Sequence, residues 1–94
     1  MKGIFCIAEC GELVTLENVK NDQGEPLKKR NITLRSLDND EIIATAFGSA
    51  AQVPVAKGDC VAASVWMRVR EYEGRRYQDA SVREMRRLLV DPKF

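Results

Sequence analysis

Polar and bulky apolar positions alternate along most of this chain, with the two-residue period of a β-strand rather than the spacing of a helix. Residues that favour turns separate the alternating segments at positions 21–24, 38–40, 58–59 and 73–74. The pattern predicts strands at about residues 2–19, 28–37, 41–48, 59–72 and 75–88. We therefore expect an all-β protein.

The alternation also assigns a face to each residue, because successive side chains of a strand point to opposite faces. In the fourth segment an apolar row is expected to point inward: Val61, Ala63, Val65, Met67 and Val69. The outward row of the same segment contains Trp66, Arg68, Arg70 and Tyr72. In the second and third segments Ile32, Leu34, Ile42, Ala44 and Ala46 are expected inside, and Lys29, Arg35, Ile43, Thr45 and Phe47 outside. Cations and aromatic residues are thus predicted to share one outward face.

The connections between these segments favour a small closed barrel. The long first segment has Gly3 and Gly11 near and inside it, and a bend at a glycine or a bulge would let one strand serve both halves of a barrel. Glu73 and Gly74 predict a hairpin turn, and Pro54 ends any helical turn in the connection 49–57. We predict a five-stranded Greek-key barrel, the OB-fold, with an SH3-like barrel or a meander as the alternative. Residues 82–90 fit either a helix or a continued strand.

The length and hydropathy of the chain limit the number of domains and the class of protein that it can form. Its 94 residues leave room for one domain, which we expect to span residues 1–94. No apolar run approaches the length of a membrane span, and Glu9 and Glu12 interrupt the apolar N-terminal stretch that a signal peptide would require. We therefore expect a soluble, cytoplasmic protein that does not engage a membrane.

The formal net charge of +1 conceals a local concentration of cations. Residues 68–87 contain seven arginines, and residues 28–35 contain basic side chains without an acid. Local basic density matters more than total charge for attracting a polyanion such as a nucleic acid. A solvated charged surface is the alternative interpretation.

The chain contains no histidine, and its three cysteines form no CxxC motif. Metal sites that use histidine, and nucleophiles that are activated by histidine, are therefore excluded. Cys6 and Cys10 share a face of the first segment, where we expect them to be buried and reduced. No pair of carboxylates is spaced for acid–base catalysis, so we expect a protein that is not an enzyme and uses no cofactor and no metal.

Several segments resemble the bacterial single-stranded-DNA-binding proteins (SSB) and their tail-less relatives, the primosomal DNA-binding proteins. TAFGSAAQ at 45–52 is similar to the end of the family's third strand, and KGDCV at 57–61 to the start of its fourth. RVREYEGRRYQDASV at 68–82 resembles its arginine-rich hairpin, and GEPLKKRNITLRS at 24–36 its second strand. The resemblance covers about three-quarters of the chain and keeps the order of the elements.

This resemblance implies an OB barrel that binds single-stranded DNA across its outer face. Phe47 and Tyr72 match stacking aromatics of the family, while Arg68 and Arg70 match cations that follow the phosphates. Glu41 stands where many members carry a stacking tryptophan, which implies weaker or shorter binding. An open barrel of this size has strand edges to cover, so we expect a homodimer or another homo-oligomer. The family also implies replication proteins as partners. The family's acidic tip is reduced to a proline and a terminal phenylalanine in DPKF at 91–94.

The residue chemistry supports the same class of ligand, because any base can stack on an aromatic ring and arginine contacts phosphate with two donors. The predicted nucleic-acid-binding residues are Lys29, Arg35, Phe47, Trp66, Arg68, Arg70, Tyr72 and Arg75. Trp66 either binds bases or fills a dimer interface, where tryptophan is enriched. The contacts do not distinguish DNA from RNA. The alternative function is an OB-type protein-interaction or assembly module that uses the face of Trp66 and the arginines.

Overall fold

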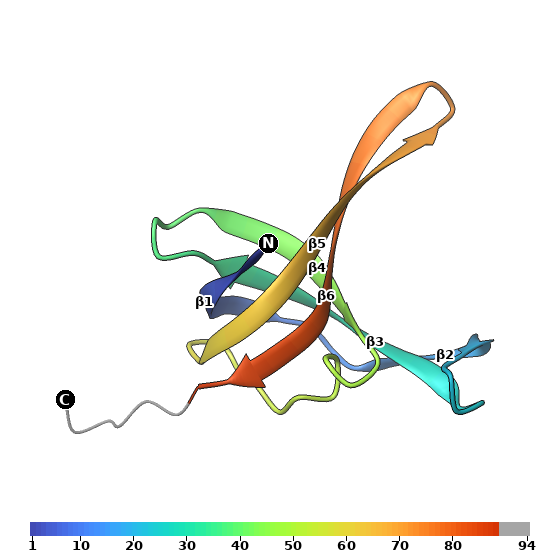
Figure 1. Ribbon diagram of the computed structural model, residues 1–94, viewed down its shortest axis with the longest axis horizontal. Coiled ribbons are helices and arrows are strands. Elements are labelled where there is room, and N and C mark those ends of the chain that lie inside the picture. Colours follow the sequence, from blue (N-terminus) through green and yellow to red (C-terminus); the bar gives the residue numbers. More distant parts are fainter. Residues whose placement is uncertain (89–94) are drawn as a thin grey trace.

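The computed structural model describes residues 1–88, which form the six strands of one sheet (Figure 1). The strands are β1 (Lys2–Cys10), β2 (Val14–Lys20), β3 (Pro26–Arg35), β4 (Glu41–Phe47), β5 (Cys60–Tyr72) and β6 (Arg75–Arg87). The last four agree with the predicted segments 28–37, 41–48, 59–72 and 75–88 to within about two residues, the usual uncertainty of strand ends. The fold class predicted from the alternation is confirmed.

The predicted first strand, residues 2–19, is wrong in one respect, because the structure divides it into β1 and β2. The division falls at Gly11, whose N–H donates a 2.8 Å hydrogen bond to the carbonyl of Asn31. A Cβ at position 11 would lie 3.0 Å from that carbonyl oxygen, so only glycine fits here without a shift of the backbone. The glycine that was expected to bend the strand therefore interrupts it.

The sheet closes on itself. Its order is β1-β5-β6-β4-β3-β2, and an additional pairing of β1 with β3 completes the barrel. β4 and β6 pair in parallel through Thr45–Ser81 and Ala46–Val82, whereas the other pairs are antiparallel. This parallel pairing excludes the meander, in which successive strands are antiparallel neighbours.

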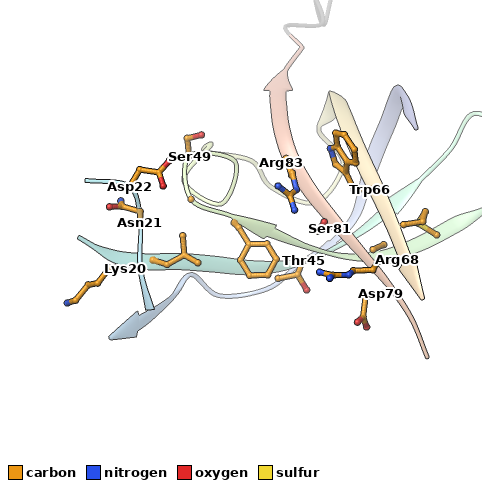
Figure 2. A pocket seen from close by; sticks show the side chains of 15 residues that line it. Lys20, Asn21, Asp22, Thr45, Ser49, Trp66, Arg68, Asp79, Ser81 and Arg83 are labelled. Atoms are coloured by element: carbon orange, nitrogen blue, oxygen red, sulfur yellow. The ribbon is translucent and has the colours of Figure 1, made fainter. Parts of the chain in front are cut away.

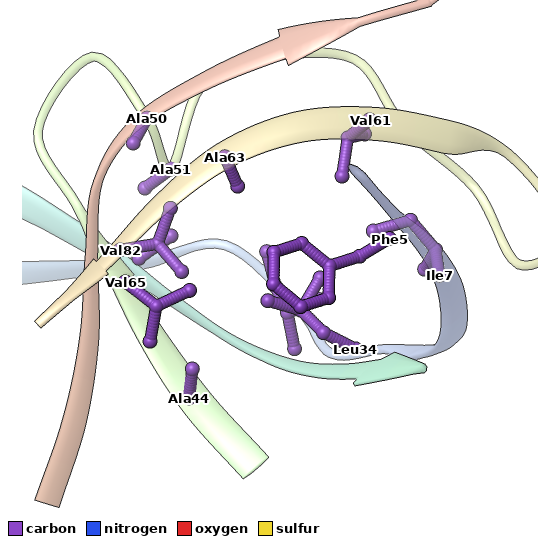
Figure 3. Close-up of a cluster of buried hydrophobic side chains, with 12 residues drawn as sticks. Phe5, Ile7, Leu34, Ala44, Ala50, Ala51, Val61, Ala63, Val65 and Val82 are labelled. Atoms are coloured by element: carbon purple, nitrogen blue, oxygen red, sulfur yellow. The ribbon is translucent and has the colours of Figure 1, made fainter. Parts of the chain in front are cut away.

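Small and branched aliphatic side chains fill the barrel together with the ring of Phe5 (Figure 3). Ile32, Leu34, Ala44 and Ala46 are buried, as the alternation predicted. Ala50 and Ala51, from the connection between β4 and β5, are also buried in this core. The predicted helical turn of this connection is a series of tight turns, in which the N–H groups of residues 51 and 52 bond to the carbonyls of residues 48 and 49. The turns place these two alanines against the other residues of the core.

β5 and β6 continue beyond the barrel as a two-stranded arm (Figure 1), formed by residues 66–72 and 75–81. The predicted inward row is therefore wrong beyond Val65, since Met67 is 46% exposed and Val69 67% exposed. Their side chains point to the same face of β5 as Val65, but the arm extends beyond the barrel, so they lie outside its interior. Glu73 and Gly74 turn the arm with φ angles of 51° and 77°, as in a type I′ hairpin.

The end of the chain continues as a strand through Arg87, so the helical alternative for residues 82–90 is wrong over residues 82–87. Leu89 and the DPKF segment at 91–94 lie outside the described residues. In the described part of the chain, no helix has the length and hydropathy needed to cross a membrane.

The cysteines are half-buried free thiols rather than fully buried ones. Cys6 and Cys60 are direct cross-strand partners, and their Sγ atoms lie 3.6 Å apart. The hydrogen bond with Cys6 and burial raise the pKa of Cys60, which favours its neutral thiol. Within residues 1–88, no group of three or more Cys, Asp or Glu side chains could hold a metal ion.

Candidate nucleic-acid interface

An open groove of about 910 Å³ lies between the β5–β6 arm and the turn that joins β2 to β3 (Figure 2). The end of β4 forms its floor. Three of the predicted binding residues line it, namely Phe47, Trp66 and Arg68. The structure therefore brings together two aromatics and a cation from two strands that are distant in sequence.

The floor of the groove comes from the outward face of β4. Phe47 is the last residue of this strand and is 37% exposed, while Gly48 follows with a φ of 61°. Lys29 on β3 lies directly opposite Phe47 in the register. Thr45 also faces the groove, and its hydroxyl donates to the side-chain oxygen of Asn31 at 3.1 Å. An exposed aromatic ring is thus flanked by a lysine and a hydroxyl group.

The arm contributes the wall that contains Trp66, which is 59% exposed. The guanidinium of Arg83 lies over the Trp66 ring, 5.7 Å from its centroid (Figure 2). The register of β5 and β6 explains this contact, because Ser64 pairs with Glu84 while Val65 pairs with Val82. Arg83 is the additional residue at this irregularity, which gives it an orientation that regular pairing would not. The cation–π contact orients Trp66 but leaves it open to solvent.

Arg70 is engaged within the protein. Its Nε donates to Asp79 at 3.0 Å, and its guanidinium lies 5.3 Å from the ring centroid of Tyr77. Asp79 is also the cross-strand partner of Arg68 and lines the groove. One carboxylate therefore lies among the arginines of the arm.

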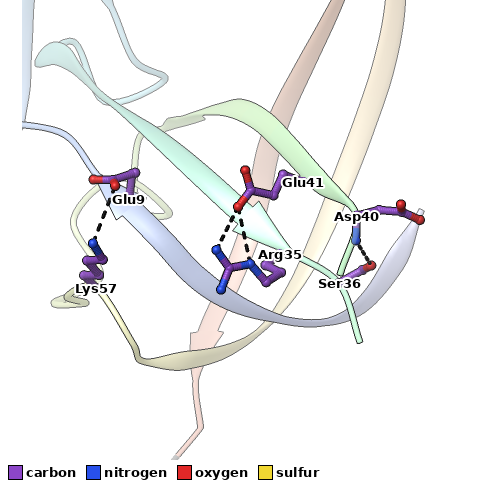
Figure 4. Close-up of polar contacts among 6 residues, drawn as sticks. All are labelled: Glu9, Arg35, Ser36, Asp40, Glu41 and Lys57. Atoms are coloured by element: carbon purple, nitrogen blue, oxygen red, sulfur yellow. Dashed lines mark hydrogen bonds and ion pairs between the residues drawn. The ribbon is translucent and has the colours of Figure 1, made fainter. Parts of the chain in front are cut away.

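The remaining predicted residues lie outside the groove. Tyr72 and Arg75 are cross-strand partners at the tip of the arm, on the same face as Trp66. Arg35 lies six residues from Lys29 along β3, or about 20 Å at the usual strand rise. Its guanidinium forms a 2.9 Å ion pair with Glu41 (Figure 4). Tyr72 and Arg75 could extend the groove outward, whereas Arg35 is separate and already paired with an acid.

The turn between β2 and β3 forms the second wall of the groove, with Lys20, Asn21 and Asp22. The side-chain oxygen of Asn21 accepts hydrogen bonds from the N–H groups of Gln23 at 2.9 Å and Glu25 at 3.0 Å. These two bonds fix the shape of the turn. Lys20 therefore stands at a defined edge of the groove.

Sequence reasoning did not assign Arg83, Asp79 or the residues of this turn to the site. Arg83 follows a buried valine, and no local pattern reveals the irregular register that directs it to Trp66. The polar residues at 21–24 indicated only a turn. The predicted Greek-key barrel did not place this turn beside the arm, because it did not include the extension of β5 and β6 beyond the barrel.

Comparison with known proteins supports the fold. No family model and no curated protein matches the chain. A solution NMR structure, the second OB-fold domain of replication protein A from Methanococcus maripaludis, is similar with a TM-score of 0.69 and 16% identity. The similarity covers 98% of this chain and 86% of that one.

The chain has an OB fold. The fold that the resemblance to bacterial SSB implied is thereby confirmed, and the SH3-like alternative is wrong. The similar structure is a replication protein A domain rather than specifically a bacterial SSB.

Proposed function

We propose that the groove binds single-stranded nucleic acid, with single-stranded DNA as the ligand to test first and RNA as the alternative. The observation that carries the proposal is the exposed Trp66 ring, which is held by Arg83 and lines one open groove together with Arg68 and Phe47. OB folds bind oligonucleotides on the face of the second and third barrel strands, between the loops that flank it. β3 and β4 are these barrel strands in this chain, because β1 and β2 divide the first.

The mechanism of binding follows from the residue types. Trp66 and Phe47 each present a face on which any base can stack, so binding would depend little on sequence. Arg68 and Arg83, with Lys20 across the groove, would contact the phosphates. Affinity should then fall steeply with salt, because counterions released from the strand drive binding.

The cellular role that fits this ligand is a non-catalytic one in DNA replication or repair, or in phage or mobile-element DNA metabolism. We also propose a cytoplasmic homodimer as the working form. The arm strands pair only with each other over most of their length, and such unpaired strand edges are commonly covered by another chain. Replication proteins are the partners that this role implies.

Replacing Arg68 with glutamine tests the phosphate contact, with Arg35→Gln as the matched control. Arg68 lines the groove, whereas Arg35 is paired with Glu41 elsewhere on the sheet. We expect Arg68→Gln to lower the slope of log affinity against log salt by about 0.7, the value for one phosphate contact to a single strand. The slope for Arg35→Gln should match that of the wild type. Equal changes in both variants, measured by fluorescence anisotropy with oligo-dT, would contradict the assignment of the groove.

A protein-interaction module is the second candidate, favoured by Val69, which is 67% exposed on the face of the arm opposite Trp66. Exposed apolar residues on a strand face are typical of surfaces that contact other proteins. A module that uses this face predicts that the Arg68→Gln variant binds its protein partner as tightly as the wild type, because Arg68 lies on the other face of the arm.

A further inference from the structure

Asp79 stands among the cations of the groove. It lies on β6 opposite Arg68, and its Oδ2 accepts the Nε–H of Arg70 at 3.0 Å. Figure 2 shows Asp79 and Arg68 on the arm wall. Of the described residues that line the groove, the other acid is Asp22, in the turn of the opposite wall. An acid in this position opposes the binding of a polyanion and has no role in the barrel core.

We propose that Asp79 is a built-in competitor for phosphate: in the free protein its carboxylate occupies Arg70, and a backbone phosphate of the bound strand displaces it. The inference rests on the proposed function, since it concerns how the same groove is regulated. Under this proposal, Asp79 limits the affinity of the groove for nucleic acid and prevents more weakly binding anions from occupying Arg70.

The chemistry of the two acceptors supports this exchange. Carboxylate and phosphate oxygens both accept hydrogen bonds from the planar donor fork of a guanidinium, so they compete for one site. The side chains of Arg70 and Asp79 are 58% and 50% exposed, and a pair in this setting is weak and readily opened. A strand with several phosphates and stacked bases therefore displaces Asp79 more readily than a single small anion does.

The packing of Arg70 shows what remains after the exchange. Its guanidinium also lies over the ring of Tyr77, 5.3 Å from the centroid, and this contact does not involve Asp79. Arg70 therefore stays on the outward face of the arm when the carboxylate is released. Asp79 itself remains close to the incoming phosphates and repels them, because their separation is well within the screening length of about 8 Å at physiological salt.

Asp79→Asn tests the proposal, with Asp38→Asn as the matched control. Both changes remove one negative charge at constant size, but Asp38 lies exposed in the β3–β4 turn, at the opposite end of β4 from Phe47. We expect Asp79→Asn to bind oligo-dT about two- to fivefold more tightly at low salt, the range that exposed ion pairs span. Asp38→Asn should bind like the wild type. In an Arg70→Gln background the gain from Asp79→Asn should be smaller, because only the direct repulsion of phosphate by Asp79 is then removed.

The outcomes separate this inference from the proposed function. Equal tightening by both asparagine variants would mean a general charge effect, and weaker binding by Asp79→Asn would mean that Asp79 only positions Arg70. Either result overturns the role of Asp79 while leaving strand binding intact. Failure of the wild-type protein to bind oligo-dT at low salt would instead overturn the proposed function, and the role of Asp79 with it.

Discussion

Replacing Trp66 with alanine is expected to weaken the binding of oligo-dT by about 5- to 150-fold, the loss of one stacked base at roughly 1–3 kcal/mol. Trp66 is the largest exposed ring in the groove, and Arg83 holds it in place from one side. The change removes the stacking surface without altering the charge of the groove. The dissociation constant would be measured by fluorescence anisotropy at several salt concentrations, where the slope should stay close to that of the wild type.

Trp66→Phe is the control for this result, because it keeps an aromatic face at the same position. It should retain most of the affinity that the alanine variant loses. Trp66 is on the exposed part of β5, so neither change should affect folding, which circular dichroism would verify. Equal affinity of Trp66→Ala and the wild type would show that the ring does not contact bases and would favour a protein interface there.

Leu34→Ala is expected to lower the free energy of unfolding by about 2–5 kcal/mol, the usual cost of removing a large aliphatic side chain from a core. Leu34 is 0% exposed on β3 and packs in the barrel interior with residues of other strands (Figure 3). A closed barrel of this size has little capacity to collapse around the cavity. Denaturant titration followed by circular dichroism would measure the change.

Ile43→Ala provides the matched comparison, since it removes an aliphatic side chain of the same size from the neighbouring strand β4. Ile43 is 78% exposed, so its loss should change stability by no more than about 0.5 kcal/mol. Similar destabilisation by the two variants would contradict the inside and outside assignment of the barrel.

The sequence pattern predicted most of the fold because short-range rules determine it. Alternation identified the last four strands and the inward positions of Ile32 and Leu34, and Glu73-Gly74 identified the hairpin. It did not predict that β5 and β6 leave the barrel, since an apolar row shows which face a residue takes but not whether another strand covers it. The exposure of Met67 and Val69 depends on that missing cover.

The candidate site was predictable only in part, for the same reason. The alternation predicted that Trp66, Arg68 and Phe47 point outward. The acid or ring that each cation contacts, however, depends on which strands are neighbours in the sheet. Arg35 is paired with Glu41 across β3 and β4, and Arg83 reaches Trp66 through an irregular register. Neither contact follows from spacing within a single segment.

The most direct test of the central claim is the binding of a labelled oligo-dT of a few tens of nucleotides to the wild-type protein. Fluorescence anisotropy would be recorded at two salt concentrations, with duplex DNA as the competitor. Strand binding through stacking and phosphate contacts predicts tight, salt-sensitive binding that duplex DNA does not displace. An absence of binding at low salt would contradict it, and would favour the protein-interaction module instead.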